Sequence, residues 1–199
     1  MLNQRLRFSF FHNNRVAAPL RDVCVSIPNP KNPELFSLRI AREHQSAATD
    51  ESFQERAARI SRSQAIFLLA LFDHCRVLCE RIRVKFHDQK FEDRFEILDS
   101  ALYLQMFAYS DSAGGAFPDA YRFSSHSSLY GFLTREFISH FDDPRLPSIE
   151  IRKTISEEEF LGQLNQIFPN PIKKDEIPLL RQEFDSKLRR FRKMLGPAA

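Results

Sequence analysis

One uninterrupted apolar run constrains the fold of this chain more than any other feature. The run covers residues 65–72 and reads Ala-Ile-Phe-Leu-Leu-Ala-Leu-Phe, inside a segment, 64–83, that favours a long helix. A helix that is apolar on all sides is stable only when other elements cover it completely. The run is also far shorter than the roughly 20 apolar residues of a membrane-spanning helix. The sequence therefore predicts a buried central helix and no passage through a membrane.

Strand periodicity dominates the first 45 residues. Residues 4–11 alternate between apolar and polar, residues 23–27 are mostly β-branched and end at a proline-rich stretch, and residues 35–42 alternate again. Alternation with period two is typical of a strand with one buried face. We therefore expect about three antiparallel strands in this part of the chain.

Cap residues, apolar spacing and terminating prolines predict a mainly helical remainder. The expected helices are a short one from about residue 49 to 60, a long one over 64–83, and four more over 99–109, 127–141, 156–168 and 175–195. Residues 148–154 favour a strand, residues 110–118 a loop, and residues 84–98 fit either a helix or a hairpin.

Together these elements predict an α+β fold, a small N-terminal antiparallel sheet packed on a mainly helical body. The 199 residues are enough for one domain with a sizeable core. We expect a single domain, 1–199, with a β-rich subregion at 1–45 and a mainly helical subregion at 46–199. The latter ends in a basic C-terminal helix, 175–195.

The chain has three cysteines, Cys24, Cys75 and Cys79, which are informative about the cellular compartment and about metal binding. Their odd number, without a secretory signal pattern, predicts reduced thiols and a cytoplasmic protein. Cys75 and Cys79 would share a face of the expected 64–83 helix, with Cys24 and His87 as the only further ligands. No paired short-spacing knuckle is present, so we expect neither a metal nor another cofactor.

The formal net charge is +3, and it is unevenly distributed, because both ends are basic and residues 101–150 are acidic. The last helix carries an apolar stripe beside a row of cations: Arg181, Lys187, Arg189, Arg190, Arg192 and Lys193. Such a face attracts phosphate backbones, although cations at a helix C-terminus also complement the helix dipole.

Arginines also alternate with phenylalanines near the N-terminus. An aromatic and arginine-rich sheet can stack bases and hold phosphates, but the same alternation is typical of any half-buried sheet. The residues that we predict to bind an anion or nucleic acid are Arg5, Arg7, Arg15, Arg39, Arg42, Lys187, Arg189, Arg190, Arg192 and Lys193.

Catalytic motifs are scarce. The chain has no phosphate-binding glycine loop and no His-Glu-x-x-His pattern. One segment, Arg135-Glu-Phe-Ile-Ser-His140, resembles the catalytic motif of HEPN-type ribonucleases, which are all-helical dimers. The resemblance covers six residues and implies a metal-independent ribonuclease that uses Arg135 and His140. The alternative is that Arg135 lies on a helix surface and His140 near a helix end.

Missing catalytic chemistry and basic ends favour a non-catalytic binding or adaptor subunit. Its expected partners are nucleic acid or an acidic protein surface, engaged through the basic termini. Two alternatives stay open: the ribonuclease just described, and a subunit of a larger assembly. In the latter, a peptide strand would add to the N-terminal sheet or another chain would cover the apolar stripe of residues 177–195.

Overall fold

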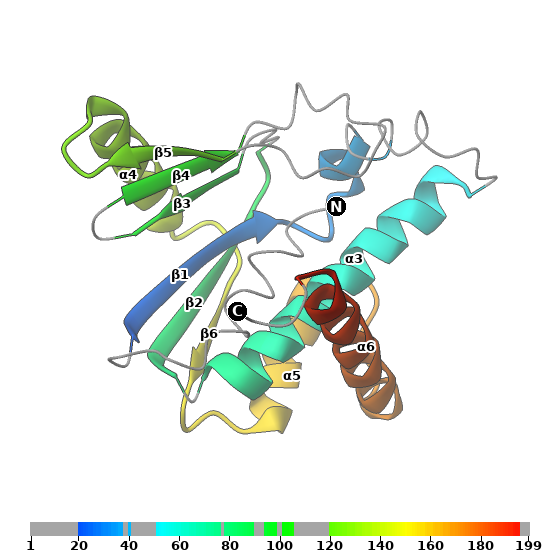
Figure 1. Ribbon diagram of the computed structural model, residues 1–199. Coiled ribbons are helices and arrows are strands. Elements are labelled where there is room, and N and C mark those ends of the chain that lie inside the picture. Colours follow the sequence, from blue (N-terminus) through cyan, green and yellow to red (C-terminus); the bar gives the residue numbers. More distant parts are fainter. Residues whose placement is uncertain are drawn as a thin grey trace.

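The computed structural model describes residues 20–37, 40, 51–76, 78–89, 94–98, 101–105 and 120–195. These residues form two three-stranded sheets and four α-helices, so the predicted α+β class is confirmed (Figure 1). The strands are β1 (Leu20–Pro28), β2 (Cys79–His87), β3 (Arg94–Ile97), β4 (Ala101–Gln105), β5 (Ala120–Ser124) and β6 (Ser148–Arg152). The helices are α3 (Phe53–Ala70), α4 (Ser128–Phe141), α5 (Glu157–Ile167) and α6 (Ile177–Leu195), with short turns η1 (Pro33–Phe36), η2 (Leu71–Cys75) and η3 (Lys174–Glu176). The predicted strand at 4–11 and loop at 110–118 lie outside the described residues.

The central sheet has the strand order β1-β2-β6, with β2 in the middle. The predicted strand at 23–27 is confirmed as part of β1, but its described partner comes from the middle of the chain. β1 and β2 run parallel, whereas β2 and β6 run antiparallel. Parallel neighbours need a long crossover, and α3 lies in the segment that connects β1 to β2. The sheet that contains β1 is therefore mixed and not antiparallel.

The predicted strand at 35–42 is wrong in its described part. Pro33 opens η1, a 3-10 helix, because its ring fixes φ and removes an amide donor. Phe36 and Ile40, four residues apart, are both buried and pack against Ala57 and Ile60 of α3. An alternating pattern also places apolar residues four positions apart, and in this segment that spacing puts Phe36 and Ile40 on one face of a helical turn.

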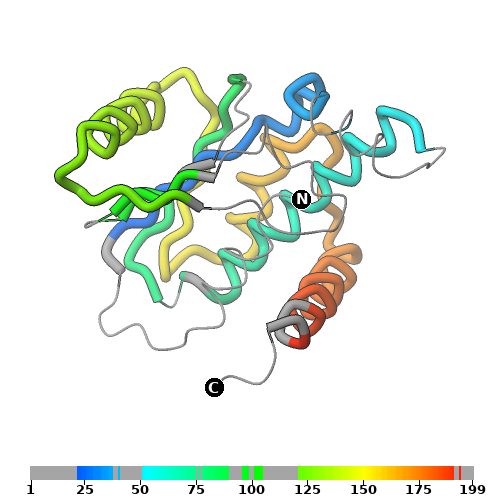
Figure 2. The backbone as a smooth tube through the Cα atoms, turned by 45° about the horizontal axis from the view of Figure 1, so that its top comes forward, coloured from blue at the N-terminus to red at the C-terminus, as the bar shows by residue number. Residues whose placement is uncertain are grey.

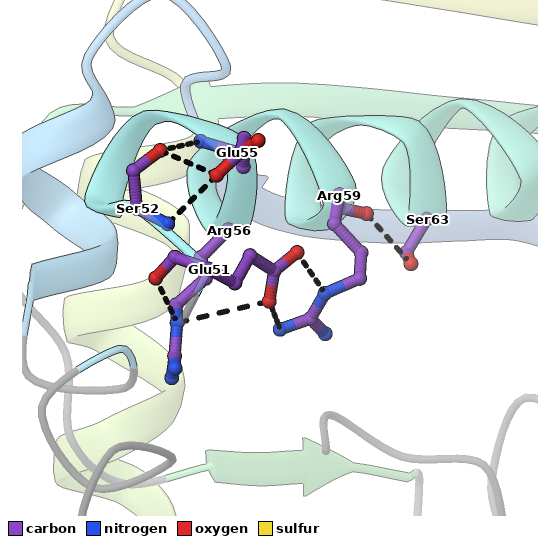
Figure 3. A network of polar contacts seen from close by, with 6 residues as sticks. All are labelled: Glu51, Ser52, Glu55, Arg56, Arg59 and Ser63. Carbon is purple, nitrogen blue, oxygen red and sulfur yellow. Dashed lines mark hydrogen bonds and ion pairs between the residues drawn. The ribbon is translucent and has the colours of Figure 1, made fainter. Parts of the chain in front are cut away.

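Helix α3 begins one residue after Ser52 and continues without a break to Ala70. Ser52 and Glu55 form a reciprocal capping box, in which the Ser52 Oγ accepts from the Glu55 amide (Figure 3). The predicted break near residue 61 is absent, because the Ser63 hydroxyl donates to the Arg59 carbonyl within the helix. The predicted burial is confirmed: Leu68 and Leu69 are at most 1% exposed.

The helical segment ends with the π-helical turn η2 and does not reach residue 83 as predicted. Residues 79–87 instead form β2, whose Ile82, Val84 and Phe86 are fully buried. Cys79 therefore lies in a strand, and it does not share a helix face with Cys75. The ambiguous segment 84–98 contributes strands to two different sheets, β2 and β3.

Residues 101–105 form β4 in place of the predicted helix. β4 is the middle strand of an antiparallel meander, β3-β4-β5, and both Ala101 and Leu102 are buried. Pairing on both sides outweighs the weak helical preference of this short segment. The later predictions are confirmed: α4, β6, α5 and α6 lie where expected, with Ser127 and Ser156 as N-caps of α4 and α5.

The main core lies between one face of the central sheet and the helices α3, α5 and α6. Figure 1 shows these three helices together on one side of the sheet, with α4 and the meander on the other side. Phe160 of α5 stacks on Phe72 of η2, with ring centroids 4.6 Å apart. On the other face of the central sheet, mostly polar side chains alternate with the core residues along each strand.

A buried guanidinium near the start of α3 gives a first testable prediction. Arg56 is 1% exposed, and its Nε donates to the Glu51 carbonyl and lies 3.7 Å from the Glu51 carboxylate (Figure 3). Arg59 pairs with the same carboxylate from an exposed position. We expect Glu51→Gln to lower the free energy of unfolding by about 1–3 kcal/mol, because a buried guanidinium loses an ionic contact. Arg59→Gln, the control, should cost about 0.5 kcal/mol or less in the same urea titration. Equal costs would contradict this account.

Candidate anion-binding surfaces

The apolar stripe of α6 packs into the core. Ile177, Leu180 and Phe184 are buried in the main core, and Leu188 packs against it. The side chains of Phe191 and Leu195 lie outside the described residues. From residue 177 to 188, therefore, this stripe is covered by the chain itself and does not offer a surface to a second protein.

Cations in the first three turns of α6 are neutralised by carboxylates. The guanidinium of Arg181 donates to both carboxylate oxygens of Asp73, at 2.8 and 2.7 Å, and also to Glu157. The hydrogen bonds that Arg181 donates to Asp73 hold its pKa above the ordinary value. Lys187 donates to Glu183 at 2.7 Å. This part of the helix presents little net positive charge.

The last two turns of α6 differ from the first part of the helix. Arg189, Arg190 and Lys193 are exposed. The Arg189 guanidinium donates to the Ser186 hydroxyl at 3.3 Å, and none of the three forms an ion pair with a carboxylate in the described part of the chain. Residues three and four apart on a helix are neighbours, so the three charges form one cluster. We call Arg189, Arg190 and Lys193 the cationic end of α6.

Most of the other predicted anion-binding residues cannot be placed beside this cluster. Arg5, Arg7, Arg15, Arg39 and Arg42 lie outside the described residues, as does the side chain of Arg192. A positive surface shared by both termini remains a prediction.

A second polar surface lies on the face of the central sheet that points away from the core. We call it the polar face; it comprises Asp22, Cys24 and Ser26 of β1, Arg81, Arg83 and Lys85 of β2, and Ser148, Glu150 and Arg152 of β6. The signal for it was present in the sequence, because Arg81, Arg83 and Lys85 alternate with buried residues. Extending the predicted helix to residue 83, and leaving residues 84–98 open between a helix and a hairpin, concealed it.

Two carboxylates of the polar face are paired with arginines of the same face. The Arg81 guanidinium donates to both oxygens of Asp22, at 2.7 and 2.8 Å, and this hydrogen bonding holds the pKa of Asp22 below its usual value. Arg152 donates to both oxygens of Glu150, at 3.0 and 3.2 Å.

The C-terminal end of α4 contacts the polar face. The Lys85 ammonium donates to the Asp143 carbonyl at 2.7 Å, just after α4, and the Arg83 guanidinium lies 5.1 Å from the centre of the Phe141 ring. His140 meets the buried His87 at the end of β2, with ring centroids 5.8 Å apart. Burial lowers the pKa of His87 to about 4. The end of α4 thus lies directly over β2.

The ribonuclease candidates Arg135 and His140 point in different directions. Five residues along an α-helix correspond to a rotation of about 140° between the two side chains. Arg135 is exposed, and its Nη1 lies 3.8 Å from the position that a Cβ on Gly131 would occupy, so it extends along α4 away from His140. His140 faces the central sheet. The structure therefore does not bring the two side chains together.

Searches of protein-family models, curated proteins and solved structures found no match to this chain. The functional argument therefore depends on the residues of this chain alone.

No helix in the described part of the chain is long and apolar enough to cross a membrane. Among the same residues, no three histidine, cysteine or acidic side chains gather as a metal-binding group.

A cavity of about 220 Å³ lies between the end of α3, η2 and α6. Ile66, Leu69 and Phe184 line its apolar part, and Asp73 and Arg181, which lie at its polar side, pair with each other. Because Asp73 and Arg181 already compensate each other, the cavity attracts a charged ligand less strongly than the surfaces described above.

Proposed function

We propose that this chain is a non-catalytic binding protein that engages nucleic acid through the cationic end of α6. The observation that carries the proposal is the contrast within one helix. Arg181 and Lys187 have carboxylate partners, whereas Arg189, Arg190 and Lys193 are exposed and have none in the described part of the chain. Intramolecular pairing thus leaves a compact cluster of positive charge at one place on the surface.

Phosphate backbones are the polyanions that such a cluster suits best. Each phosphate that a lysine or arginine neutralises releases condensed counterions, which gives affinity without sequence recognition. Arginine and lysine side chains are long enough to adapt to the irregular spacing of phosphates. The predicted N-terminal arginines would strengthen the same interaction if they lie nearby.

Charge reversal tests the proposal. The triple variant Arg189→Glu, Arg190→Glu, Lys193→Glu should weaken binding to a fluorescent mixed-sequence duplex by at least about tenfold at about 50 mM salt. Its plot of log affinity against log salt concentration should also be shallower by about two to three, one for each lost phosphate contact. Fluorescence anisotropy measures both quantities.

A matched control distinguishes the loss of a local binding site from the effect of a lower overall net charge. Lys153, Lys173 and Lys174 are also exposed, and changing all three to glutamate alters the net charge equally. We expect this control to keep most of the affinity. Equal losses in both triple variants would contradict a site on α6. Tighter binding to polyglutamate than to the duplex would point to an acidic protein partner instead.

A further inference from the structure

The middle of the polar face holds an arginine whose hydrogen-bonding capacity is largely unused. Arg83 lies on the central strand, with Cys24 and Glu150 as its register partners on the two neighbouring strands. A guanidinium has five N–H donors. In the described part of the chain, the hydrogen bond that it makes is from Nη2 to the Cys24 sulfur, a weak acceptor, at 3.3 Å. The Arg83 Nε is buried and meets no acceptor there.

The nearby carboxylates do not compensate the charge of Arg83. Although Glu150 is its register partner, both Glu150 oxygens accept from Arg152, and both Asp22 oxygens accept from Arg81. The polar face carries four cations, Arg81, Arg83, Lys85 and Arg152, against these two carboxylates. Its centre is therefore positively charged. Among the described residues neither Arg83 nor Lys85 forms an ion pair, and Lys85 donates instead to the Asp143 carbonyl.

A second donor without an acceptor lies on the neighbouring strand of the same face. The Ser26 hydroxyl is buried and has no hydrogen-bond partner among the described residues. Ser26 follows Cys24 by two positions on the same face, so its Cα is diagonal to that of Arg83 at a distance of about 8 Å. An arginine side chain spans such a gap. A buried donor without an acceptor is unfavourable, and each one in a folded chain calls for an explanation.

We propose that Arg83 and Ser26 bind the phosphoryl group of a small ligand on the polar face, next to Phe141. A phosphoryl group has several terminal oxygens, of which two accept from the planar guanidinium fork while another accepts from the serine hydroxyl. A carboxylate has two oxygens in one plane and satisfies the fork alone. The site is independent of the cationic end of α6, because α6 and α4 lie on opposite sides of the central sheet in both views (Figures 1 and 2).

Titration of the whole chain with inorganic phosphate, followed by amide NMR, tests this site. At constant ionic strength, signals from residues 24–26 and 83–85 should shift saturably with phosphate and should not shift with acetate. Arg83→Met should abolish the shifts. Arg83→Lys keeps the charge but loses the fork, so it should weaken phosphate binding by about tenfold. Ser26→Ala should weaken binding by a smaller factor.

Arg152→Met is the matched control. It removes an arginine from the same face but one that is already paired with Glu150, so phosphate binding should change by less than about twofold. Absence of saturable shifts in the wild-type chain up to about 20 mM phosphate, well above millimolar affinity, would overturn the proposal. Wild-type-like titration of Arg83→Lys, or of a folded Arg83→Met, would overturn it as well. The charge-reversed α6 variant should bind phosphate normally, which keeps this test separate from that of nucleic-acid binding.

Discussion

Replacement of Phe160 by alanine should lower the free energy of unfolding by about 3–5 kcal/mol. Phe160 is 0% exposed, and its ring stacks on that of Phe72 at an interplanar angle of 10°. The Arg76 guanidinium also lies over the Phe72 ring, 4.1 Å from its centre. The substitution therefore removes an aromatic contact between α5 and η2 and leaves a cavity in a packed core, which adds to the cost of the lost apolar contacts.

Urea titration at neutral pH measures this loss, and two further variants define its cause. Phe160→Leu retains most of the apolar volume and should cost only about 1–2 kcal/mol. Phe132→Ala removes the same atoms from α4, where the side chain is 52% exposed, and should cost less than about 1 kcal/mol. A loss for Phe160→Ala no larger than that for Phe132→Ala would show that α5 does not pack on the core in this way.

Helices in the second half of the chain could be predicted because several local signals agree there. Ser127 and Ser156 both cap a helix through their side chains, and each helix ends close to a proline-containing turn. These signals act within a few residues of each other, so they are visible without knowledge of the fold. The buried central helix was predictable for a different reason: an apolar run of that length has to be covered.

The strands between residues 79 and 105 could not be assigned because their partners are distant in sequence. β2 is stabilised by β1 on one side and β6 on the other, about 60 and 70 residues away, and no local pattern specifies that pairing. The apolar run that precedes β2 favours extending the helix to residue 83. The two candidate surfaces, the cationic end of α6 and the polar face, differ in the same way, because one depends on local spacing and the other on distant pairing. The α6 cations were found from helical spacing, whereas Arg83 was concealed by the wrong assignment.

Acid should destabilise the fold through His87. The ring is 4% exposed, and its Nδ1 lies 2.9 Å from the Gln89 carbonyl. Burial is the main cause that lowers its pKa from 6.5 to about 4, against the hydrogen bond with Gln89 and the nearby Asp88, while His140 acts in the same direction as burial. Above pH 6.5 the ring is neutral in both the folded and the unfolded chain, so its contribution to stability is fully present there.

Below pH 6.5 the unfolded chain takes up a proton that the folded chain does not. Stability therefore falls as the pH drops from 6.5 towards 4, by at most about 3 kcal/mol for a difference of about 2.5 in pKa. The loss reaches its limit below pH 4. Carboxylates also lose their ion pairs in acid, so the decrease in the wild-type chain alone does not identify the histidine.

The comparison with His87→Gln isolates the histidine. Glutamine has no titrating ring, so this variant should be less stable than the wild-type chain at pH 7, where it loses packing, but should lose less stability between pH 6.5 and 4.5. His126→Gln, at an exposed position, should follow the wild-type pH dependence. Urea midpoints at three pH values give all three curves. Parallel curves for His87→Gln and the wild type would mean that protonation of this ring is not coupled to folding, and that α4 does not hold His87 in a dry contact with the central sheet.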